Sequence, residues 1–164
     1  MPDIGGCGWD AITRIWGRDG RRRKRGEKGG GEIVVKKLAG LHDAEVVGIR
    51  IDDVDLEIDL ARSQYQTIRF RGVEILRVED FLKRNIVSVA WLIDAEMDRA
   101  RVSQALTSAI TMADGTELLD KAAFMRVLND VYLGRIFIVE LESSFGASIY
   151  IVCKSVILDD IVIA

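Results

Sequence analysis

The sequence predicts an α+β domain whose antiparallel β-sheet consists of an N-terminal meander and a C-terminal hairpin, with two helices between them. Three observations support this fold class. Apolar and polar residues alternate with a period of two through residues 45–93, the period changes to that of a helix through residues 97–134, and the alternation returns from residue 135. A run of strands, followed by helices and then by further strands, is typical of an antiparallel sheet with segregated helices.

The first two strands are expected to form a hairpin. The segment EVVGIRI (45–51) alternates, Asp52 and Asp53 supply a turn, and VDLEIDLA (54–61) returns with strict alternation. Because successive side chains of a strand point to opposite faces, one face of this hairpin should be apolar. The residues expected on that face are Val47, Ile49, Ile51, Val54, Leu56, Ile58 and Leu60.

The other face of the second strand is acidic. Its three carboxylates belong to Asp55, Glu57 and Asp59. The next predicted strand, QTIRFRGV (66–73), carries Arg69 and Arg71 at alternate positions. Opposite charges attract across neighbouring strands, so we expect these arginines to share a sheet face with the carboxylates. The three carboxylates are also candidate binding residues, because exposed charge of one sign steers association with a partner of the other sign.

The remaining elements follow in order. EILRVEDF (74–81) and NIVSVAWLI (85–93) are expected to complete the meander. MDRARVSQALTSAI (97–110) and TELLDKAAFMRVLNDVYLG (116–134) suit helices. The chain then closes with a hairpin, which is formed by RIFIVELE (135–142), a SSFGAS turn (143–148) and IYIVCKSVIL (149–158).

The second helix has a predicted start, stop and apolar stripe. Asp114 and Glu117 have the spacing of a capping box, and Gly134 is suited to the position after the last helical residue. The stripe expected to face the core consists of Leu118, Ala122, Met125 and Tyr132, widened by Leu128 and Leu133.

Charge divides the chain into two parts. Residues 1–32 contain eight Lys and Arg against five Asp and Glu, whereas residues 33–164 contain fifteen against twenty-one. The run GRDGRRRKRGEKGGGE (17–32) has glycine and charge but no apolar anchor. We therefore expect a flexible basic head over residues 1–32 and a single α+β domain over residues 33–164. Since that domain is acidic, a nucleic-acid partner for it is disfavoured.

The sequence lacks the motifs that would indicate several classes of site. No apolar run is long enough to span a bilayer, and MPDIGGCGWD (1–10) does not resemble a secretion signal, so we expect a cytoplasmic protein. Cys7 and Cys153 lie at opposite ends of the chain, and one histidine with two cysteines is too small a ligand set to indicate a zinc site. DDVDLEID (52–59) lacks the glycine of a calcium loop, and GCGWDA (6–11) matches a dinucleotide fingerprint without the strand that should precede it. The sequence thus predicts no metal and no cofactor.

The only histidine, His42, lies beside Asp43 in the segment LHDA (41–44). A carboxylate can orient an imidazole to act as a general base. Adjacent residues of a β-type segment point to opposite faces, however, so we expect Asp43 to be badly placed to orient His42. We favour a structural role, in which Leu41 is buried and the two polar side chains bond to nearby backbone where the chain enters the sheet. A role for His42 and Asp43 in a binding surface stays open, and no catalytic residue is assigned.

The chain resembles a bacterial family of uncharacterised domains. The resemblance is carried by LHDAEVVGIRID (41–52), IRFRGVEILRVEDF (68–81), NIVSVAWLI (85–93) and VELESSFGASIYIVCKSV (139–156). An LHDA opening followed by a strand of this type also occurs in small domains that include immunity proteins of toxin–immunity systems. The resemblance implies a β-rich fold and implies no catalytic residue.

Three functional classes follow from these observations. The leading hypothesis is a protein-binding module of the immunity type, because the acidic domain shows no catalytic set. The first alternative is a small hydrolase-like enzyme that uses His42 and a carboxylate such as Asp43. The second is a module tethered to a membrane or a nucleic acid through RRRKR (21–25), which follows Trp9, Ile12 and Trp16 at helical spacing. For the head itself we favour a third interpretation, an extension that the domain does not need, since the pattern of the domain starts directly after it.

Overall fold

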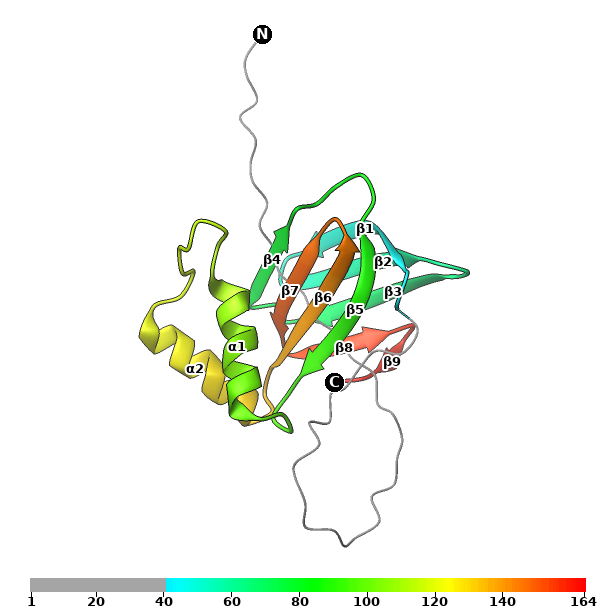
Figure 1. Ribbon diagram of the computed structural model, residues 1–164. Helices are drawn as coiled ribbons and strands as arrows, with labels where there is room; N and C mark the ends of the chain where they lie inside the picture. Colours follow the sequence, from blue (N-terminus) through cyan, green and yellow to red (C-terminus); the bar gives the residue numbers. More distant parts are fainter. Residues whose placement is uncertain (1–40) are drawn as a thin grey trace, which may run out of the picture.

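The computed structural model describes residues 41–164, which form a nine-stranded antiparallel sheet and two helices (Figure 1). Both helices lie between strand groups in the chain, so the predicted α+β class is confirmed. The head predicted over residues 1–32 lies outside the described residues. The elements in chain order are β1 (Glu45–Asp52), β2 (Asp55–Ala61), β3 (Tyr65–Arg71), β4 (Ile75–Glu79), β5 (Ile86–Ile93), α1 (Arg99–Ile110), α2 (Lys121–Tyr132), β6 (Phe137–Phe145), β7 (Ser148–Cys153), β8 (Ser155–Leu158) and β9 (Ile161–Val162).

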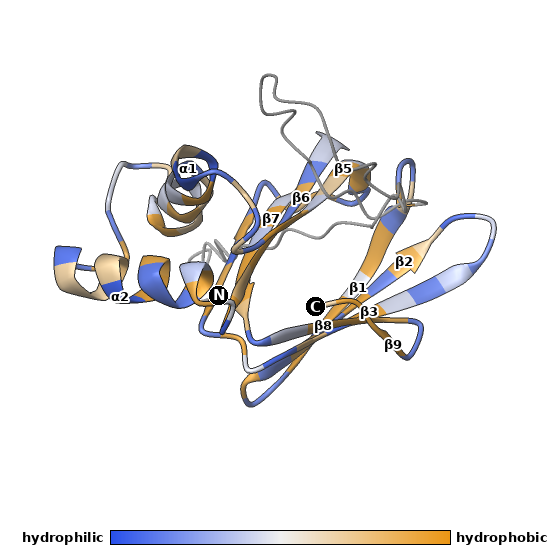
Figure 2. Ribbon diagram, turned by 90° about the horizontal axis from the view of Figure 1, so that it is seen from below, coloured by the Kyte–Doolittle hydropathy of each residue, from blue (hydrophilic) through white to orange (hydrophobic). Residues whose placement is uncertain are grey.

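The sheet is bent into two layers. Its strand order is β4-β7-β6-β5-β1-β2-β3-β8-β9. Figure 2 shows that β5, β6 and β7 lie in one layer, whereas β1, β2, β3, β8 and β9 lie in the other. The layers are joined where β1 meets β5, through the single register pair Glu45–Ile86. The chain itself crosses between the layers at residues 72–74, between β3 and β4, and returns at Lys154, the one residue between β7 and β8.

The meander is shorter than expected. Strands β1, β2 and β3 follow one another in the sheet, but β4 pairs with β7 and β5 pairs with β6. The chain leaves β3 at Gly72, whose φ of 59° turns the backbone. Val73 then donates to Val54, and Glu74 donates to Val152 in the other layer. The apolar residues of β4 are thereby placed in the second layer, and β8 takes the edge of β3 that the meander would have used.

A bulge changes which face of β1 is apolar. Val46 pairs with Leu60 and Gly48 with Asp59, so Val47 is the extra residue and is about half exposed. Downstream of the bulge, Ile49 and Ile51 keep their predicted face opposite residues of β2. The expected positions of Val47 and Val54 were wrong, since one lies in the bulge and the other in the turn before β2. A one-residue bulge resets the alternation, and period-two counting cannot detect it.

The core lies between the two layers, and a helix covers one outer face. The inward residues of β2 and β3 are fully buried, and they are Leu56, Ile58, Leu60, Ile68 and Phe70. The facing layer contributes buried residues that include Val139, Leu141, Ile149 and Ile151. Helix α1 lies against β4, β7 and β6, and α2 packs against α1, so both helices are on the same side of that layer (Figure 2).

The second helix begins later than predicted. Asp120, and not Asp114, caps α2, because its carboxylate accepts a hydrogen bond from the backbone of Ala123 at 2.7 Å. Asp114 instead accepts from the backbone of Thr116 in the preceding loop. The predicted stop at Gly134 is confirmed by its φ of 67° directly after the C-cap.

The apolar stripe predicted for this helix was wrong in part. Leu128 is buried and Tyr132 packs against the core, as predicted, whereas Leu118 precedes the helix and the side chains of Ala122, Met125 and Leu133 are exposed. The buried side chains are Val127, Leu128 and Val131. The true stripe is rotated around the helix because the facing surface of α1 selects the packing side, and the sequence alone offered two apolar faces.

Leu41 anchors the entry into the sheet, as predicted. It has no exposed surface. The backbone around it is held by three hydrogen bonds, from Ala44 to the Leu41 carbonyl at 3.1 Å, from Asp43 to Val87 at 2.9 Å and from Val87 to Ala44 at 2.9 Å. The first described residue is thus part of the core and fixes where β1 meets β5.

Substitution of Leu41 tests this anchor. Leu41→Ala is expected to lower the free energy of unfolding by about 2–5 kcal/mol, since it leaves a cavity between the layers. Urea unfolding of the purified protein measures the loss. Val47→Ala, at the exposed bulge, is the control and should change stability by no more than about 0.5 kcal/mol. Equal small effects of both substitutions would contradict the anchoring role.

Candidate functional site

The His42–Asp43 pair makes a contact that the sequence did not predict. His42 Nδ1 lies 2.8 Å from an Asp43 carboxylate oxygen. The expectation that Asp43 could not orient His42 was wrong because these residues form a turn and not a strand, and Asp43 has a φ of 64°. Left-handed backbone of this kind breaks the alternation of side-chain directions. The two side chains were expected to bond to nearby backbone but contact each other, and it is the Asp43 backbone N–H that bonds to the sheet.

The surroundings of this pair are open. The side chains of His42 and Asp43 are 68% and 63% exposed. General-base catalysis by a histidine relies on a substrate held within hydrogen-bond reach, usually in a concave site. The one hollow described below is lined by other residues. His42 and Asp43 therefore contact each other as a catalytic dyad would, but they do not line a concave site that could hold a substrate.

The acidic face of β2 is paired with arginines, which confirms the predicted register. Arg69 lies opposite Glu57 and donates to it from Nε at 2.8 Å, and Arg71 donates to Asp55. Arg50 of β1, which sequence reasoning did not include, donates to Glu57 at 2.8 Å and also to Asp59. These interactions form a ladder of alternating charge across β1, β2 and β3.

This ladder changes what the three carboxylates can do. Each of Asp55, Glu57 and Asp59 is bonded to at least one guanidinium of the same sheet. A carboxylate in such a pair offers a basic partner less attraction than a free one, because the guanidinium beside it offsets its field. Their role as binding residues stays a prediction. The ladder and the His42–Asp43 turn are not brought into one site, since Asp55 and the turn lie at opposite ends of the β1–β2 hairpin.

Three separate chain segments meet beside the His42–Asp43 turn. Asp43 donates its backbone N–H to Val87, and Val46 donates to Asn85. Ile86 pairs with Phe145 at the end of β6. The start of β1, the loop before β5 and the β6–β7 turn therefore lie side by side at one end of the sheet (Figure 1).

Asn85 locks two of these segments together. Its buried side chain accepts hydrogen bonds from Leu82 at 2.9 Å and from Ala147 at 3.0 Å, and it donates to the Leu82 carbonyl at 2.8 Å. Gly146 has a φ of 87°, and a Cβ there would lie 2.5 Å from the Arg84 carbonyl oxygen. The loop before β5 and the β6–β7 turn are consequently held in fixed, close contact.

Large apolar side chains are exposed on this locked framework. Phe81, Leu82 and Phe145 are each about half exposed. We call these three residues, together with His42 and Asp43 on the adjoining segment, the exposed rim. Sequence reasoning missed its three apolar members because it placed Phe81 in a strand (EILRVEDF) and Phe145 in a turn (SSFGAS), and it assigned Leu82 to no element. The signal that could have found Phe81 and Phe145 was an aromatic residue at each of two loop ends, since loops run over the protein surface.

A buried polar row lies beneath α1. Trp91, Glu140, Tyr150 and Arg77 are register neighbours across β5, β6, β7 and β4. Arg101 of α1 donates to the Glu140 carboxylate at 2.8 Å, and the guanidinium lies 5.9 Å from the Trp91 ring centre. Burial lowers the pKa of Arg101. Because Glu140 is fully buried, this row holds the helix on the sheet and is closed to substrates.

Other classes of site are not supported within residues 41–164. None of the described helices is long and apolar enough to cross a membrane. In the same part of the chain, no three His, Cys, Asp or Glu side chains gather in a way that could hold a metal ion. Cys153 is buried without a disulfide, and burial raises the pKa of its thiol well above the ordinary value, which makes it a poor nucleophile.

The charge ladder should make stability depend on pH. Hydrogen bonds from Gly72 and Arg71 lower the pKa of Asp55, and Arg50 lowers the pKa of Glu57 and Asp59. Carboxyls with lowered pKa in the folded state contribute stability above their ordinary values of 3.8 and 4.5, and this contribution is lost as the pH falls below them. We expect thermal unfolding to show that loss between about pH 5 and pH 2.

Arg50→Gln should reduce this pH dependence, because Glu57 and Asp59 would then titrate closer to their ordinary values. Arg126→Gln, which removes one positive charge from α2, is the control and should follow the unchanged protein. Parallel curves for Arg50→Gln and the unchanged protein would show that the ladder does not couple to folding.

The buried pair under α1 supports a second prediction. Arg101→Met should lower the free energy of unfolding by about 3–5 kcal/mol, since the buried Glu140 carboxylate loses its guanidinium. Arg135→Met, which removes an exposed pair with Asp130, should cost no more than about 1 kcal/mol. Adding Glu140→Leu to Arg101→Met should recover most of the loss. A loss from Arg101→Met as small as that of the control would mean that the pair does not hold the helix.

Comparisons of the chain with protein-family models, with curated proteins and with solved structures find no match. The resemblance to immunity-type domains stays an expectation from the sequence.

Proposed function

We propose that this chain is a cytoplasmic bacterial binding protein of the immunity type, and that a protein partner docks on the exposed rim. The observation that supports the proposal is the half exposure of Phe81, Leu82 and Phe145 on loops that Asn85 locks together. The immunity type is taken from the sequence resemblance, and the docking surface is taken from the structure.

The rim has the properties of an interface centre. Aromatic side chains are enriched in the cores of protein interfaces, where a few residues contribute most of the binding energy. Rigid presentation adds to affinity, because little conformational entropy is lost when the partner binds. Asn85 and Gly146 supply that rigidity here. Asp43 within the rim and the Arg84–Glu45 pair beside it would form the polar border of the interface.

The hydrolase alternative is less well supported. The contact between His42 and Asp43 favours it, but both side chains are mostly exposed. Binding uses exposed polar groups at an interface border, whereas catalysis needs a substrate held against them. We therefore assign His42 and Asp43 to binding. The tethered alternative depends on the head and lies outside the described residues.

The proposal is tested by co-expressing the chain with each protein encoded beside it in the genome. Complex formation is followed by gel filtration, and neutralisation is followed by growth when the neighbouring product is toxic. Phe81→Ser combined with Phe145→Ser should weaken the complex by at least about 30-fold, which corresponds to about 2 kcal/mol. Met125→Ser combined with Leu133→Ser removes two similarly exposed apolar residues near α2 and should leave binding unchanged.

The outcomes separate the two parts of the proposal. If no neighbouring product binds the unchanged chain, the immunity function is wrong. If a product binds and the rim variant binds it as tightly as the unchanged chain, the rim is not the interface. Thermal unfolding must first show that both double variants are folded. If the rim variant is not folded, the single substitution Phe81→Ala takes its place.

A further inference from the structure

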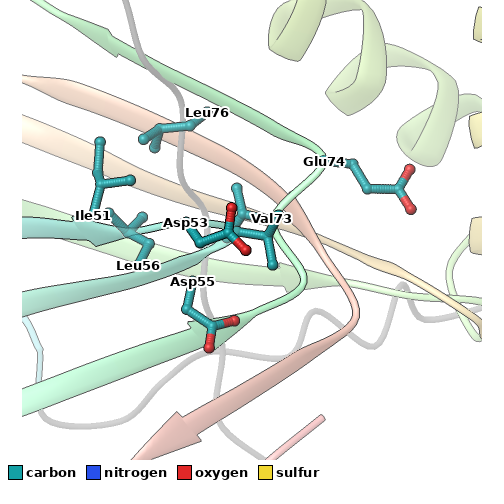
Figure 3. A pocket seen from close by; sticks show the side chains of 8 residues that line it. Ile51, Asp53, Asp55, Leu56, Val73, Glu74 and Leu76 are labelled. Carbon is teal, nitrogen blue, oxygen red and sulfur yellow. The ribbon is translucent and has the colours of Figure 1, made fainter.

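A hollow of about 200 Å³ opens where the two layers separate at the β1–β2 turn (Figure 3). Its lining comes from the end of β1, the turn, the start of β2 and the connection from β3 into β4. The lining residues are Ile51, Asp53, Val54, Asp55, Leu56, Val73, Glu74 and Leu76. Ile51 and Leu56 are register partners, and Leu76 reaches the same space from the other layer. The floor of the hollow is therefore the uncovered end of the apolar core.

The volume of the hollow limits its ligand. Sites for small molecules and cofactors usually measure about 300–1,000 Å³. This hollow is smaller, and Ile51 and Val54 are more than half exposed beside it. A space of this size suits one long side chain lying on an apolar floor.

The charge at the hollow determines which terminal group the bound side chain should carry. The Asp53 carboxylate lies among the lining residues in Figure 3, on a turn whose φ at Asp53 is 53°. Within residues 41–164, no ion pair joins Asp53 to a basic side chain. The Asp55 carboxylate is already bonded to Arg71 and to the Gly72 N–H, and the Glu74 carboxylate points away from the other lining residues. Asp53 is thus the carboxylate that a ligand can use.

We propose that the hollow binds a lysine or arginine side chain presented by a protein partner. Both side chains place an aliphatic stem on apolar surface and keep a charged end in water, which matches an apolar floor with a carboxylate at its edge. The charge of the described part is complementary, because residues 41–164 contain 21 Asp and Glu against 13 Lys and Arg. The inference rests on the proposed function only in that a protein carries the basic side chain. It concerns a different end of the sheet from the exposed rim.

The test uses a model compound, so that it does not depend on the identity of the partner. Backbone amide resonances of the full chain are followed by NMR while N-acetyl-lysine methylamide is added. We expect shifts confined to residues 51–56 and 73–76, with a Kd of about 1 mM, the affinity typical of a ligand of this size. N-acetyl-norleucine methylamide has the same stem without the ammonium group, and it should bind at least about fivefold more weakly.

Two matched variants locate the charge. Asp53→Asn should reduce the affinity for the lysine compound to that of the norleucine compound, and asparagine tolerates the positive φ of this turn. Asp52→Asn removes the same charge at a neighbouring residue outside the lining, and it should change affinity by less than about twofold. Absence of shifts at the hollow, or equal binding of the two compounds, would overturn the inference.

Failure here differs from failure of the proposed function. If the lysine compound does not bind at the hollow, the rim variants can still weaken a partner complex. If the rim variants leave the complex unchanged, the lysine compound can still bind at Asp53. If a partner is found, Asp53→Asn should weaken its complex by about fivefold or more. Unchanged affinity would show that the partner presents no basic side chain to the hollow.

Discussion

The bend of the sheet between β5 and β1 is the constraint on which the rest of the structure depends. Only one register pair, Glu45–Ile86, joins the two strands, so they diverge and the nine-stranded sheet folds onto itself. An unbent sheet of this composition would leave an apolar face in water, because β2, β3, β6 and β7 all carry buried residues on the inward side. Closure of the two layers covers that face, and burial of Leu41 at the bend holds the layers in position. The single residue between β7 and β8 allows the chain to cross back without leaving the core uncovered.

The same bend determines where functional surfaces can form. At one end it brings the β1 entry against the loop before β5, which β5–β6 pairing holds beside the β6–β7 turn, and Asn85 bonds to both of these last two segments. At the other end the layers have separated, and Ile51 and Leu76 line an open hollow because no further residue of the described chain fills it. One fold feature therefore accounts for a rigid apolar surface and for an uncovered end of the core, and the two surfaces suit different chemistry.

Charge is used in two different ways on the two layers. On the outer face of β1, β2 and β3, arginines and carboxylates alternate and remain partly exposed, so each pair contributes little alone and the ladder mainly favours one register. Beneath α1, Glu140 is removed from water and Arg101 is mostly buried, so removal of Arg101 would leave a costly buried carboxylate. The carboxylates that looked like a docking face in the sequence thus have internal partners, while an exposed carboxylate, Asp53, lies in a turn.

The sequence by itself determined the local features of this protein. Alternation located most strands, the opposite charges of Glu57 and Arg69 predicted the β2–β3 register, and Gly134 marked the end of α2, because these depend on residues close together in the chain. The bulge at Val47 and the contact between His42 and Asp43 depend on local backbone conformations that alternation cannot represent. The buried face of α2 was decided by packing against α1. The strand order, the exposed rim and the hollow were decided only by the tertiary structure. Phe81 and Phe145, or Asp53 and Leu76, are far apart in the sequence. The pairing of β5 with β6 places the first two side by side, and the folding of the sheet onto itself brings the second two to one hollow.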